Sequence, residues 1–277
     1  MKILDCRELA KQINDNIKTE VDKLSNKPKL AIINVGDNLD NLSYQNNAKK
    51  KMESLGIECL CYNYNKNITS QILFDEINKI NNSDINGILV LQPLPKHINP
   101  NILQSINPNK DIDCITYNNL GKLFVGNPDF IPCTSLAVIE ILNYFNIDVN
   151  YKNVVIIGRS NTVSKPLAHL LTNMNSTVTL CHSYTQDLQD KTLNSDIVIS
   201  ACGQAKYIDN NYIKDNQVVI DVGINFIDNK ICGDINIETL SDLDIKITPV
   251  PFGVGSITTS ILAKQVLQAY NKQNKKE

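Results

Sequence analysis

The sequence predicts an α/β protein with two domains, of which the second has the doubly wound arrangement of nucleotide-binding domains. Short apolar runs alternate with amphipathic stretches, which is typical of parallel strands joined by helices. A loop-rich connector over residues 107–133 separates two such series. Within the second series, residues 154–166 predict a buried strand, a tight turn at a glycine and the start of a helix.

The composition limits the classes of function that fit this chain. The chain has 277 residues and a formal net charge of −2, so no bulk attraction to nucleic acid or to an anionic membrane is expected. Eight cysteines are scattered without a C-x-x-C pair, and the three histidines do not lie at ligand spacing from them. We therefore expect reduced thiols in a cytoplasmic protein without a metal site. Neither a signal segment nor a membrane-spanning apolar run is predicted.

The first series begins with an amphipathic helix over residues 7–25, in which Leu9, Ile13 and Ile17 recur at helical spacing. Gly56 is a suitable C-cap for a second helix, and Pro93 follows the last strand of the series. Strands are predicted at 29–35, 59–62 and 88–91, and the further helices at 42–55 and 71–80.

The second series begins with a helix over residues 136–145, for which Thr134 or Ser135 is a suitable N-cap. The final helix, over residues 256–272, has a mostly apolar face that must pack against another element. Between these two helices, strands are predicted at 154–157, 176–181, 196–200, 217–221 and 244–247.

The turn at Gly158 keeps only the first glycine of the usual G-x-G-x-x-G dinucleotide fingerprint. Ser160 is a good N-cap residue, and the helix N-terminus beside it is expected to present free N–H groups to an anion. The next strand ends at His182-Ser183, without the carboxylate that binds a ribose 2′-hydroxyl. Arg159 and Ser183 would instead suit a 2′-phosphate, which favours NADP over NAD. The alternative is an ordinary turn in which Arg159 is a surface arginine.

Several motifs occur along nearly the whole chain in the order seen in one enzyme family. They are GILVLQPLP at 87–95, KDID at 110–113, PCT at 132–134, VIIGRSNTVSKP at 155–166, VIDVGIN at 219–225, Gly233-Asp234 and TPVPFGVGSIT at 248–258. The sequence therefore resembles the methylenetetrahydrofolate dehydrogenase/cyclohydrolase family.

The resemblance implies an enzyme that oxidises 5,10-methylenetetrahydrofolate to 5,10-methenyltetrahydrofolate with NADP, within one-carbon metabolism and purine biosynthesis. In most members of the family the same cleft then hydrolyses the product to 10-formyltetrahydrofolate. The implied fold has two α/β domains with this cleft between them. Residues 1–135, completed by a C-terminal helix at 257–277, would bind the folate, and residues 136–256 would bind NADP. The implied assembly is a cytoplasmic homodimer formed through the nucleotide domains.

The resemblance also implies which residues form the site. Tyr44 and Asp113 match catalytic and substrate-binding residues of the family's folate site, where a carboxylate suits the amidine-like edge of the pterin; the alternative for Asp113 is a capping role. Phe252 replaces a glycine and would either stack on the pterin or fill space. The loop that closes over the folate corresponds to Pro249, Val250, Pro251, Phe252 and Gly253. Cofactor contacts are implied for Gly158, Arg159, Ser160, Ser183, Ala201, Gly203 and Ile224.

Two catalytic positions depart from the family pattern. The family has a lysine four residues after its tyrosine, and Ala48 stands at that position here. It also has a glutamine directly before L-P-L-P, where this chain has Leu91 followed by Gln92. Lys49 would lie about 140° around the helix from Tyr44. A shift of one residue along an extended segment turns the Gln92 side chain to the opposite face.

Loss of the lysine and the glutamine is expected to affect the oxidation and the hydrolysis unequally. Hydride transfer asks the protein mainly to position the substrate against the cofactor, whereas hydrolysis needs an activated water and proton transfers. We therefore expect a dehydrogenase with weak or absent cyclohydrolase activity. Three alternatives stay open: a bifunctional enzyme that uses Lys49 or Gln92, a two-domain reductase for a small hydroxy acid, and a non-catalytic ligand-binding paralogue.

Overall fold

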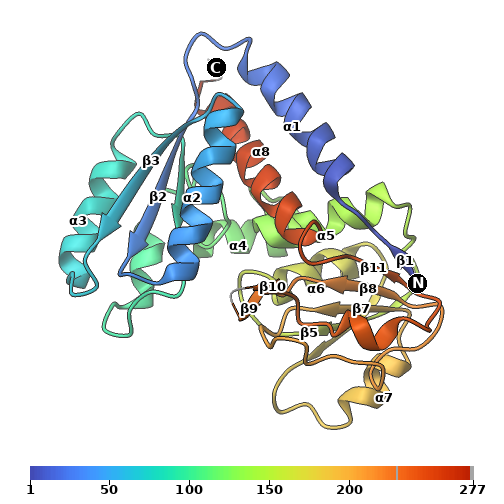
Figure 1. Ribbon diagram of the computed structural model, residues 1–277. Coiled ribbons are helices and arrows are strands. Elements are labelled where there is room, and N and C mark those ends of the chain that lie inside the picture. The colour runs from blue at the N-terminus through green and yellow to red at the C-terminus, as the bar shows by residue number, and fades with distance from the viewer. Residues whose placement is uncertain (229, 275–277) are drawn as a thin grey trace. The chain divides into compact units, whose positions relative to one another are not determined.

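The computed structural model describes residues 1–228 and 230–274, and the chain divides into two compact units (Figure 1). The three-stranded unit comprises Gln12–Cys133 and the chain from Thr259 onward. The six-stranded unit comprises Met1–Lys11 and Thr134–Thr258. Each unit is named after its parallel sheet, and each sheet is combined with helices. The predicted two-domain α/β fold with parallel sheets is therefore confirmed.

The three-stranded sheet has the order β3-β2-β4, and both neighbouring pairs are parallel. Every residue of the central strand after Lys29 is buried, because helices flank the sheet (Figure 1). The strands are β2 (Lys29–Val35), β3 (Glu58–Tyr64) and β4 (Gly87–Val90). The flanking helices are α2 (Leu39–Ser54) and α3 (Ser70–Asn81).

The connector predicted at 107–133 contains a helix that its sequence does not indicate. Helix α4 (Tyr117–Phe124) follows a 3₁₀ helix, η1 (Pro100–Ser105). Thr116 caps α4, since its hydroxyl accepts a hydrogen bond from the N–H of Asn119 at 3.4 Å. The helix is only eight residues long and contains Gly121, so neither its period nor its propensity is strong.

The six-stranded sheet has the order β1-β11-β8-β7-β5-β6, and all of its pairs are parallel. The chain passes from β5 to β6 on one side and then to β7 on the other side of β5, so the winding direction reverses there. The carboxyl ends of strands at such a reversal are where doubly wound sheets bind ligands. The strands are β1 (Lys2–Ile3), β5 (Asn153–Ile157), β6 (Thr177–Cys181), β7 (Ile197–Ser200), β8 (Val218–Asp221) and β11 (Lys246–Ile247).

Short elements complete the six-stranded unit. An antiparallel hairpin follows β8, and its strands are β9 (Asn225–Ile227) and β10 (Lys230–Cys232). The helices are α5 (Cys133–Tyr144), α6 (Ser164–Asn173), α7 (Leu188–Leu193) and the 3₁₀ helix η2 (Ile237–Leu240). The sequence gives no signal for α7, η2 or the hairpin, because each of these segments is too short to show a period.

The two ends of the chain are shared between the units. Helices α1 (Arg7–Val21) and α8 (Val254–Asn274) both begin in the six-stranded unit and continue in the three-stranded unit. Strand β1 pairs with β11, and the N–H of Lys2 donates to the carbonyl of Ile245 at 2.7 Å. Residues 1–11 therefore lie in the six-stranded unit, whereas the predicted boundary placed them in the first domain. A strand of two residues leaves no pattern from which its partner can be deduced.

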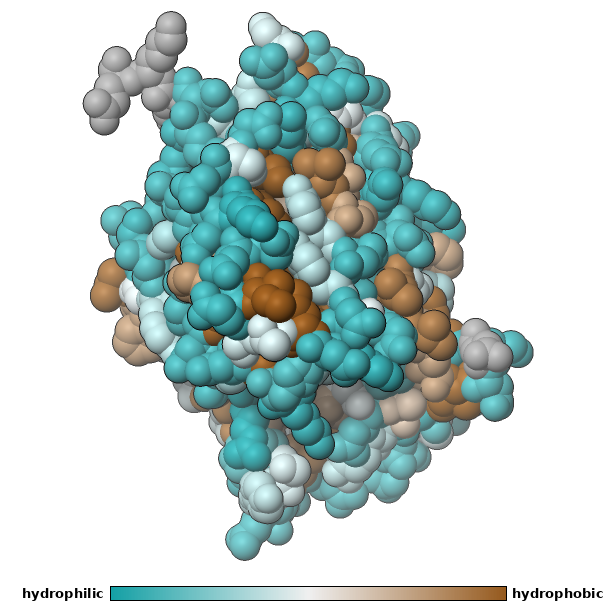
Figure 2. Space-filling model, turned by 90° about the vertical axis from the view of Figure 1, so that its left-hand side faces the viewer, coloured by the Kyte–Doolittle hydropathy of each residue, from teal (hydrophilic) through white to brown (hydrophobic). Residues whose placement is uncertain are grey.

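The surface drawn in Figure 2 is mostly hydrophilic, and its apolar residues gather in small, separate patches. Scattered apolar side chains of this kind are normal on a folded protein. In the part of the chain that the structure describes, no helix is both long and apolar enough to cross a bilayer.

Candidate active site

The KDID motif at residues 110–113 supplies three charged side chains, and each has a different role. The first, Lys110, is buried and reaches the end of α3. Its Nζ donates to the carbonyls of Ser83 at 2.7 Å and Ile80 at 3.4 Å. Burial lowers the pKa of this lysine. Lys110 therefore closes the C-terminal end of a helix, where a cation is favoured.

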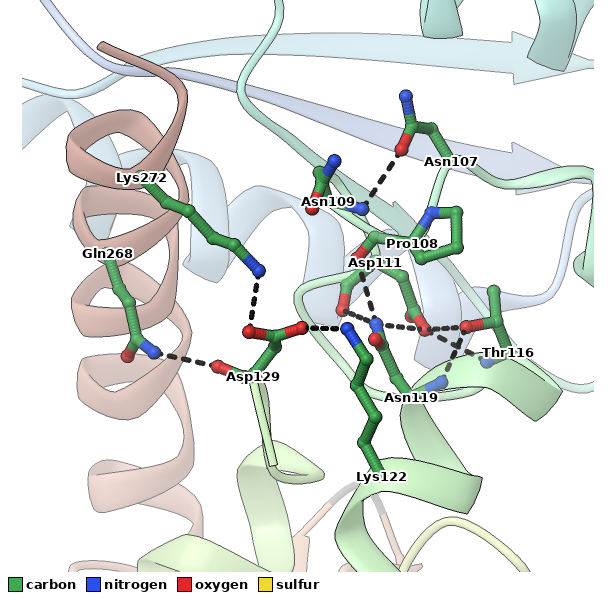
Figure 3. A network of polar contacts seen from close by, with 10 residues as sticks. All are labelled: Asn107, Pro108, Asn109, Asp111, Thr116, Asn119, Lys122, Asp129, Gln268 and Lys272. Atoms are coloured by element: carbon green, nitrogen blue, oxygen red, sulfur yellow. Dashed lines mark hydrogen bonds and ion pairs between the residues drawn. The ribbon is translucent and has the colours of Figure 1, made fainter. Parts of the chain in front are cut away.

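Asp111, the second charged residue of the motif, is fully buried and organises the start of α4 (Figure 3). Its carboxylate accepts hydrogen bonds from the N–H of Ile115 at 3.0 Å and from the N–H and hydroxyl of Thr116 at 2.9 and 2.6 Å. Asn119 Nδ2 donates to it at 2.9 Å and to the carbonyl of Pro108 at 2.9 Å. The carboxylate is fully occupied, so its role is structural.

Asp113 is the member of the motif that remains available for a ligand. Its Oδ1 accepts the N–H of Cys133 at 2.9 Å, and the side chain is half-buried. Burial raises the pKa of Asp113 to about 6, against the lowering effect of that N–H. The pKa of Tyr44, on α2, is raised by burial and by the nearby Cys133 and Asp113 side chains. The structure therefore brings the two predicted folate residues, Tyr44 and Asp113, to one place.

Gln265 on α8, which was not among the predicted site residues, holds the segments on both sides of this place together. Its Nε2 donates to the carbonyl of Ile112 at 2.5 Å and to the Sγ of Cys133 at 3.1 Å. Its Oε1 accepts the N–H of Ile131 at 3.0 Å. The side chain is 2% exposed. A glutamine inside the otherwise apolar face of the final helix is the sequence signal that marks such a role.

A second polar cluster fixes α8 one turn further along (Figure 3). Asp129 accepts from the ammonium groups of Lys122 and Lys272, which hold its pKa below the ordinary value. Gln268 Nε2 donates to the carbonyl of Asp129 at 2.7 Å. The final helix is thus bound to the segments that carry Asp113 and Cys133 by hydrogen bonds as well as by apolar packing.

The loop predicted to close over the folate lies in the six-stranded unit and has an unusual backbone. Phe252 has a φ of +75°, which a bulky residue rarely adopts. A Cβ on Gly253 would overlap the carbonyl of Pro249. Phe252 is 52% exposed, so its ring does not fill the core. The N–H of Cys6 donates to its carbonyl at 3.0 Å, and the guanidinium of Arg7 lies 5.1 Å from the ring centre.

The predicted nucleotide turn follows β5 and requires its glycine. Gly158 has a φ of +145°, and a Cβ there would lie 2.5 Å from the carbonyl oxygen of Ala201 and 2.6 Å from Ser164 Oγ. The N–H of Gly158 donates to the carbonyl of Cys181 at 2.8 Å, and the N–H of Ala201 donates to that of Ile157 at 2.8 Å. The carboxyl ends of β5, β6 and β7 are therefore in close contact at this turn.

The expectation of free N–H groups at the start of α6 is wrong. Ser160 Oγ accepts the N–H groups of Val163 at 3.1 Å and Ser164 at 3.2 Å, and its carbonyl accepts that of Lys165 at 3.1 Å. Ser160 therefore satisfies the first turn of the helix from within the chain. Binding of an anion at this turn therefore depends on the exposed side chains that precede the helix. Among these, Arg159 carries a positive charge.

Two buried aspartates that were not among the predicted site residues shape the loops after β7 and β8. Asp234 accepts the N–H groups of Cys202 at 2.8 Å, Gly203 at 3.2 Å and Gln204 at 3.0 Å. Asp221 accepts the N–H groups of residues 223, 234 and 235 at 2.9, 3.0 and 2.9 Å. Burial raises the pKa of Asp221 to about 7.

These aspartates explain the glycines in the motifs VIDVGIN and Gly233-Asp234. A Cβ on Gly223 would overlap the carboxylate of Asp234, and a Cβ on Gly233 would overlap that of Asp221. The buried Asp234 carboxylate therefore fixes the loop that carries Ala201 and Gly203. Ile224, in the following loop, is 56% exposed. All the residues predicted to contact the cofactor thus lie in loops that follow β5, β6, β7 and β8.

Comparison with known proteins accounts for both units. The family model described as tetrahydrofolate dehydrogenase/cyclohydrolase, NAD(P)-binding domain, matches residues 132–274. The model described as the catalytic domain of the same family matches residues 4–113. The chain belongs to the tetrahydrofolate dehydrogenase/cyclohydrolase family. It is 43% identical over 280 residues to the bifunctional protein FolD of Clostridium botulinum strain Okra, with 99% of each chain covered.

Solved structures of the family share the whole fold of the chain. The bifunctional dehydrogenase/cyclohydrolase FolD of Campylobacter jejuni has a TM-score of 0.93 at 39% identity and covers 98% of this chain and 99% of its own. The FolD of Trypanosoma brucei, complexed with NADP and an inhibitor, has a TM-score of 0.94 at 32% identity, with 99% and 98% covered.

The two positions predicted to correspond to the family's lysine and glutamine are apolar and buried in this chain. Ala48 is 0% exposed and Leu91 is 6% exposed. Lys49 forms an ion pair with Glu53, with 3.8 Å between Nζ and Oε1. The positive charge of Lys49 lowers the pKa of Cys59, against the larger raising effect of burial. Gln92 is exposed. Besides burial, the groups that raise the pKa of Tyr44 are Cys133 and Asp113.

The different roles of the two aspartates in KDID can be separated by stability measurements. Replacing Asp111 with Ala leaves several buried donors without an acceptor and is expected to lower the free energy of unfolding by about 3 kcal/mol. Replacing Asp113 with Ala removes one backbone hydrogen bond from a half-buried group and is expected to cost less than about 1 kcal/mol. Urea unfolding of the two variants and the native chain measures both values. Equal losses for the two variants would contradict the assignment.

Proposed function

We propose that this protein oxidises 5,10-methylenetetrahydrofolate to 5,10-methenyltetrahydrofolate with NADP, and that its cyclohydrolase activity is weak or absent. Family membership across both units supports the oxidation. The burial of Ala48 and Leu91 at the two family positions is the observation that carries the second half of the proposal. The three-stranded unit would bind the folate and the six-stranded unit the cofactor.

The residues at the carboxyl edge of the six-stranded sheet fit NADP. The glycine at 158 lets the turn after β5 lie directly against the carbonyl of Ala201, so the loops after β5 and β7 meet at the edge where doubly wound sheets bind nucleotides. Arg159 and Ser183 are exposed in the turns after β5 and β6, and no carboxylate occurs at 182–186 to bind a ribose 2′-hydroxyl. NADP supplies the nicotinamide ring that accepts the hydride.

The oxidation requires little acid–base chemistry from the protein. Loss of a hydride from the methylene carbon leaves a cation that the two neighbouring substrate nitrogens stabilise, and no proton moves in this step. Asp113 would accept hydrogen bonds from the pterin edge, with Tyr44 beside it. The loop at Ala201–Gly203, fixed by Asp234, would shape the nicotinamide side. Orientation by such rigid groups is the main contribution required.

The second reaction requires a group that this chain lacks at the family positions. Hydrolysis of the methenyl cation needs a water that loses a proton as it attacks. Ala48 and Leu91 carry no group that can accept this proton, and Lys49 is paired with Glu53. The exposed Gln92 side chain has no basic nitrogen. These observations favour the monofunctional proposal over a bifunctional enzyme that uses Lys49 or Gln92.

A homodimer in the cytoplasm is the assembly that we infer. The hairpin after β8 exposes Phe226, Ile227 and Ile231, which are 46%, 41% and 47% accessible in the single chain. Adjacent apolar side chains of this kind are typical of a surface that another subunit covers. This placement agrees with a dimer formed through the six-stranded unit.

Assays of both reactions on one preparation test the proposal. NADPH formation from methylenetetrahydrofolate should proceed at an ordinary enzymatic rate. Loss of absorbance from added methenyltetrahydrofolate should exceed the buffer-catalysed rate little or not at all, since loss of a general acid–base group costs about 10²–10⁴-fold. Comparable rates for the two reactions would refute the monofunctional proposal, and no NADPH formation would favour a non-catalytic paralogue.

Restoring the family residues tests whether these two positions are the cause. The double variant Ala48→Lys, Leu91→Gln should raise cyclohydrolase turnover by about tenfold or more, because it returns a proton acceptor and its polar partner. Lys50→Met, at an exposed position of the same helix, is the matched control for altered lysine content and should leave both rates unchanged. An unchanged rate of hydrolysis in a folded double variant would show that the site differs elsewhere.

The pKa of Asp113 predicts how substrate capture depends on pH. The carboxylate is the form that accepts the pterin donors, and its pKa is raised to about 6 by burial. Lowering the pH through about 6 protonates Asp113, so kcat/KM for methylenetetrahydrofolate should fall about tenfold per pH unit below that value. Asp113→Asn should lower kcat/KM at neutral pH and remove this dependence. Persistence of the same inflection in Asp113→Asn would assign it to another group.

A further inference from the structure

The turn after β6 is held rigid by its own hydrogen bonds. The N–H of His182 donates to Thr185 Oγ1 at 2.8 Å, and the N–H of Thr185 donates back to the carbonyl of His182 at 2.8 Å. The N–H of Tyr184 donates to His182 Nδ1 at 3.2 Å. The two residues at the tip, Ser183 and Tyr184, therefore point outward from a fixed backbone, and Tyr184 is 79% exposed.

The turn after β5 places a guanidinium against this tip. Arg159 Cζ lies 5.5 Å from the centre of the Tyr184 ring. A guanidinium over an aromatic face is attracted by the ring quadrupole, while its N–H groups remain free in their own plane. No carboxylate is paired with Arg159 in the part of the chain that the structure describes. Nearby, Lys165 Nζ is engaged with Asn161 Oδ1 at 2.7 Å.

We propose that Tyr184 is a positioning residue for cofactor specificity, because its ring holds the Arg159 guanidinium at the turn that carries Ser183, where a 2′-phosphate would bind. This inference rests on the proposed use of NADP and extends it to a residue that touches the phosphate only through another. An exposed arginine without such a support loses side-chain entropy when it binds an anion. Contact with the Tyr184 ring restricts the Arg159 side chain before any ligand binds, so less side-chain entropy is lost on binding. Only a ligand that carries the 2′-phosphate uses Arg159 and gains from this.

The proposal separates Tyr184 from a general role in dinucleotide binding. A residue that packs on the adenine or supports the turn would affect NAD⁺ and NADP⁺ equally. A residue that acts through Arg159 affects NADP⁺ alone, and its effect disappears once Arg159 is removed. The hydroxyl of the tyrosine is not required, since the ring face provides the attraction.

Binding measured by isothermal titration calorimetry, without folate substrate, tests this. Tyr184→Leu should weaken NADP⁺ binding by about two- to five-fold, the range expected for an exposed cation–π contact, and leave NAD⁺ binding unchanged. Tyr184→Phe should bind both as the native chain does. In an Arg159→Ala background, Tyr184→Leu should have no further effect on NADP⁺. Tyr151→Leu, at a tyrosine that is 86% exposed before β5, is the control for loss of a surface ring.

Three results would overturn the inference. They are an equal loss of NADP⁺ and NAD⁺ affinity in Tyr184→Leu, a loss of NADP⁺ affinity that persists in the Arg159→Ala background, and unchanged NADP⁺ affinity in Tyr184→Leu. Failure of the proposed function looks different, because the native protein would then form no NADPH from methylenetetrahydrofolate. A native enzyme that forms NADPH but binds both nucleotides equally overturns the role of Tyr184 and leaves the reaction in place.

Discussion

Buried carboxylates that accept backbone N–H groups are the interaction on which both candidate sites depend. Asp111 fixes the chain that leads into α4, and Asp234 fixes the loop after β7. A charge in the interior is tolerated only when several donors surround it, and main-chain donors converge on one point only in one loop conformation. Each carboxylate therefore selects the conformation of a loop that carries site residues. Asp113 has a single backbone donor and keeps capacity for a ligand.

The regular part of the fold could be predicted from the sequence, and the irregular part could not. Apolar runs such as 29–35 and 154–157 are buried on both faces and are recognisable without partners. The pairing of β1 with β11 joins residues more than two hundred positions apart through two residues of strand, and no local pattern contains that information. Helix α4 depends on Thr116 and on the Asp111 carboxylate, which are features of side-chain geometry rather than of period.

The residues of the candidate site also divide into those that the sequence predicts and those that it does not. Gly158 was predictable because a turn between a buried strand and a helix demands a glycine, whereas Gly223 and Gly233 are required by carboxylates from elsewhere in the chain. Ser160 was recognisable as a capping residue, but the same capping uses the N–H groups that an anion would need. Gln265 reaches Ile112 and Cys133 from a distant helix, and such contacts follow from packing alone.

In the proposed monofunctional enzyme, the physical chemistry of buried polar groups explains why the lysine and the glutamine would be lost together. The two positions are nearly inaccessible here, at 0% and 6% exposure. A polar side chain left at such a position without its partner costs about 1–3 kcal/mol, whereas two apolar side chains of suitable volume cost little. Loss of one member of the pair therefore favours loss of the other. Under the proposed function, hydride transfer needs neither group, so selection for that reaction alone would maintain the rigid loops and Asp113 but not a buried proton acceptor.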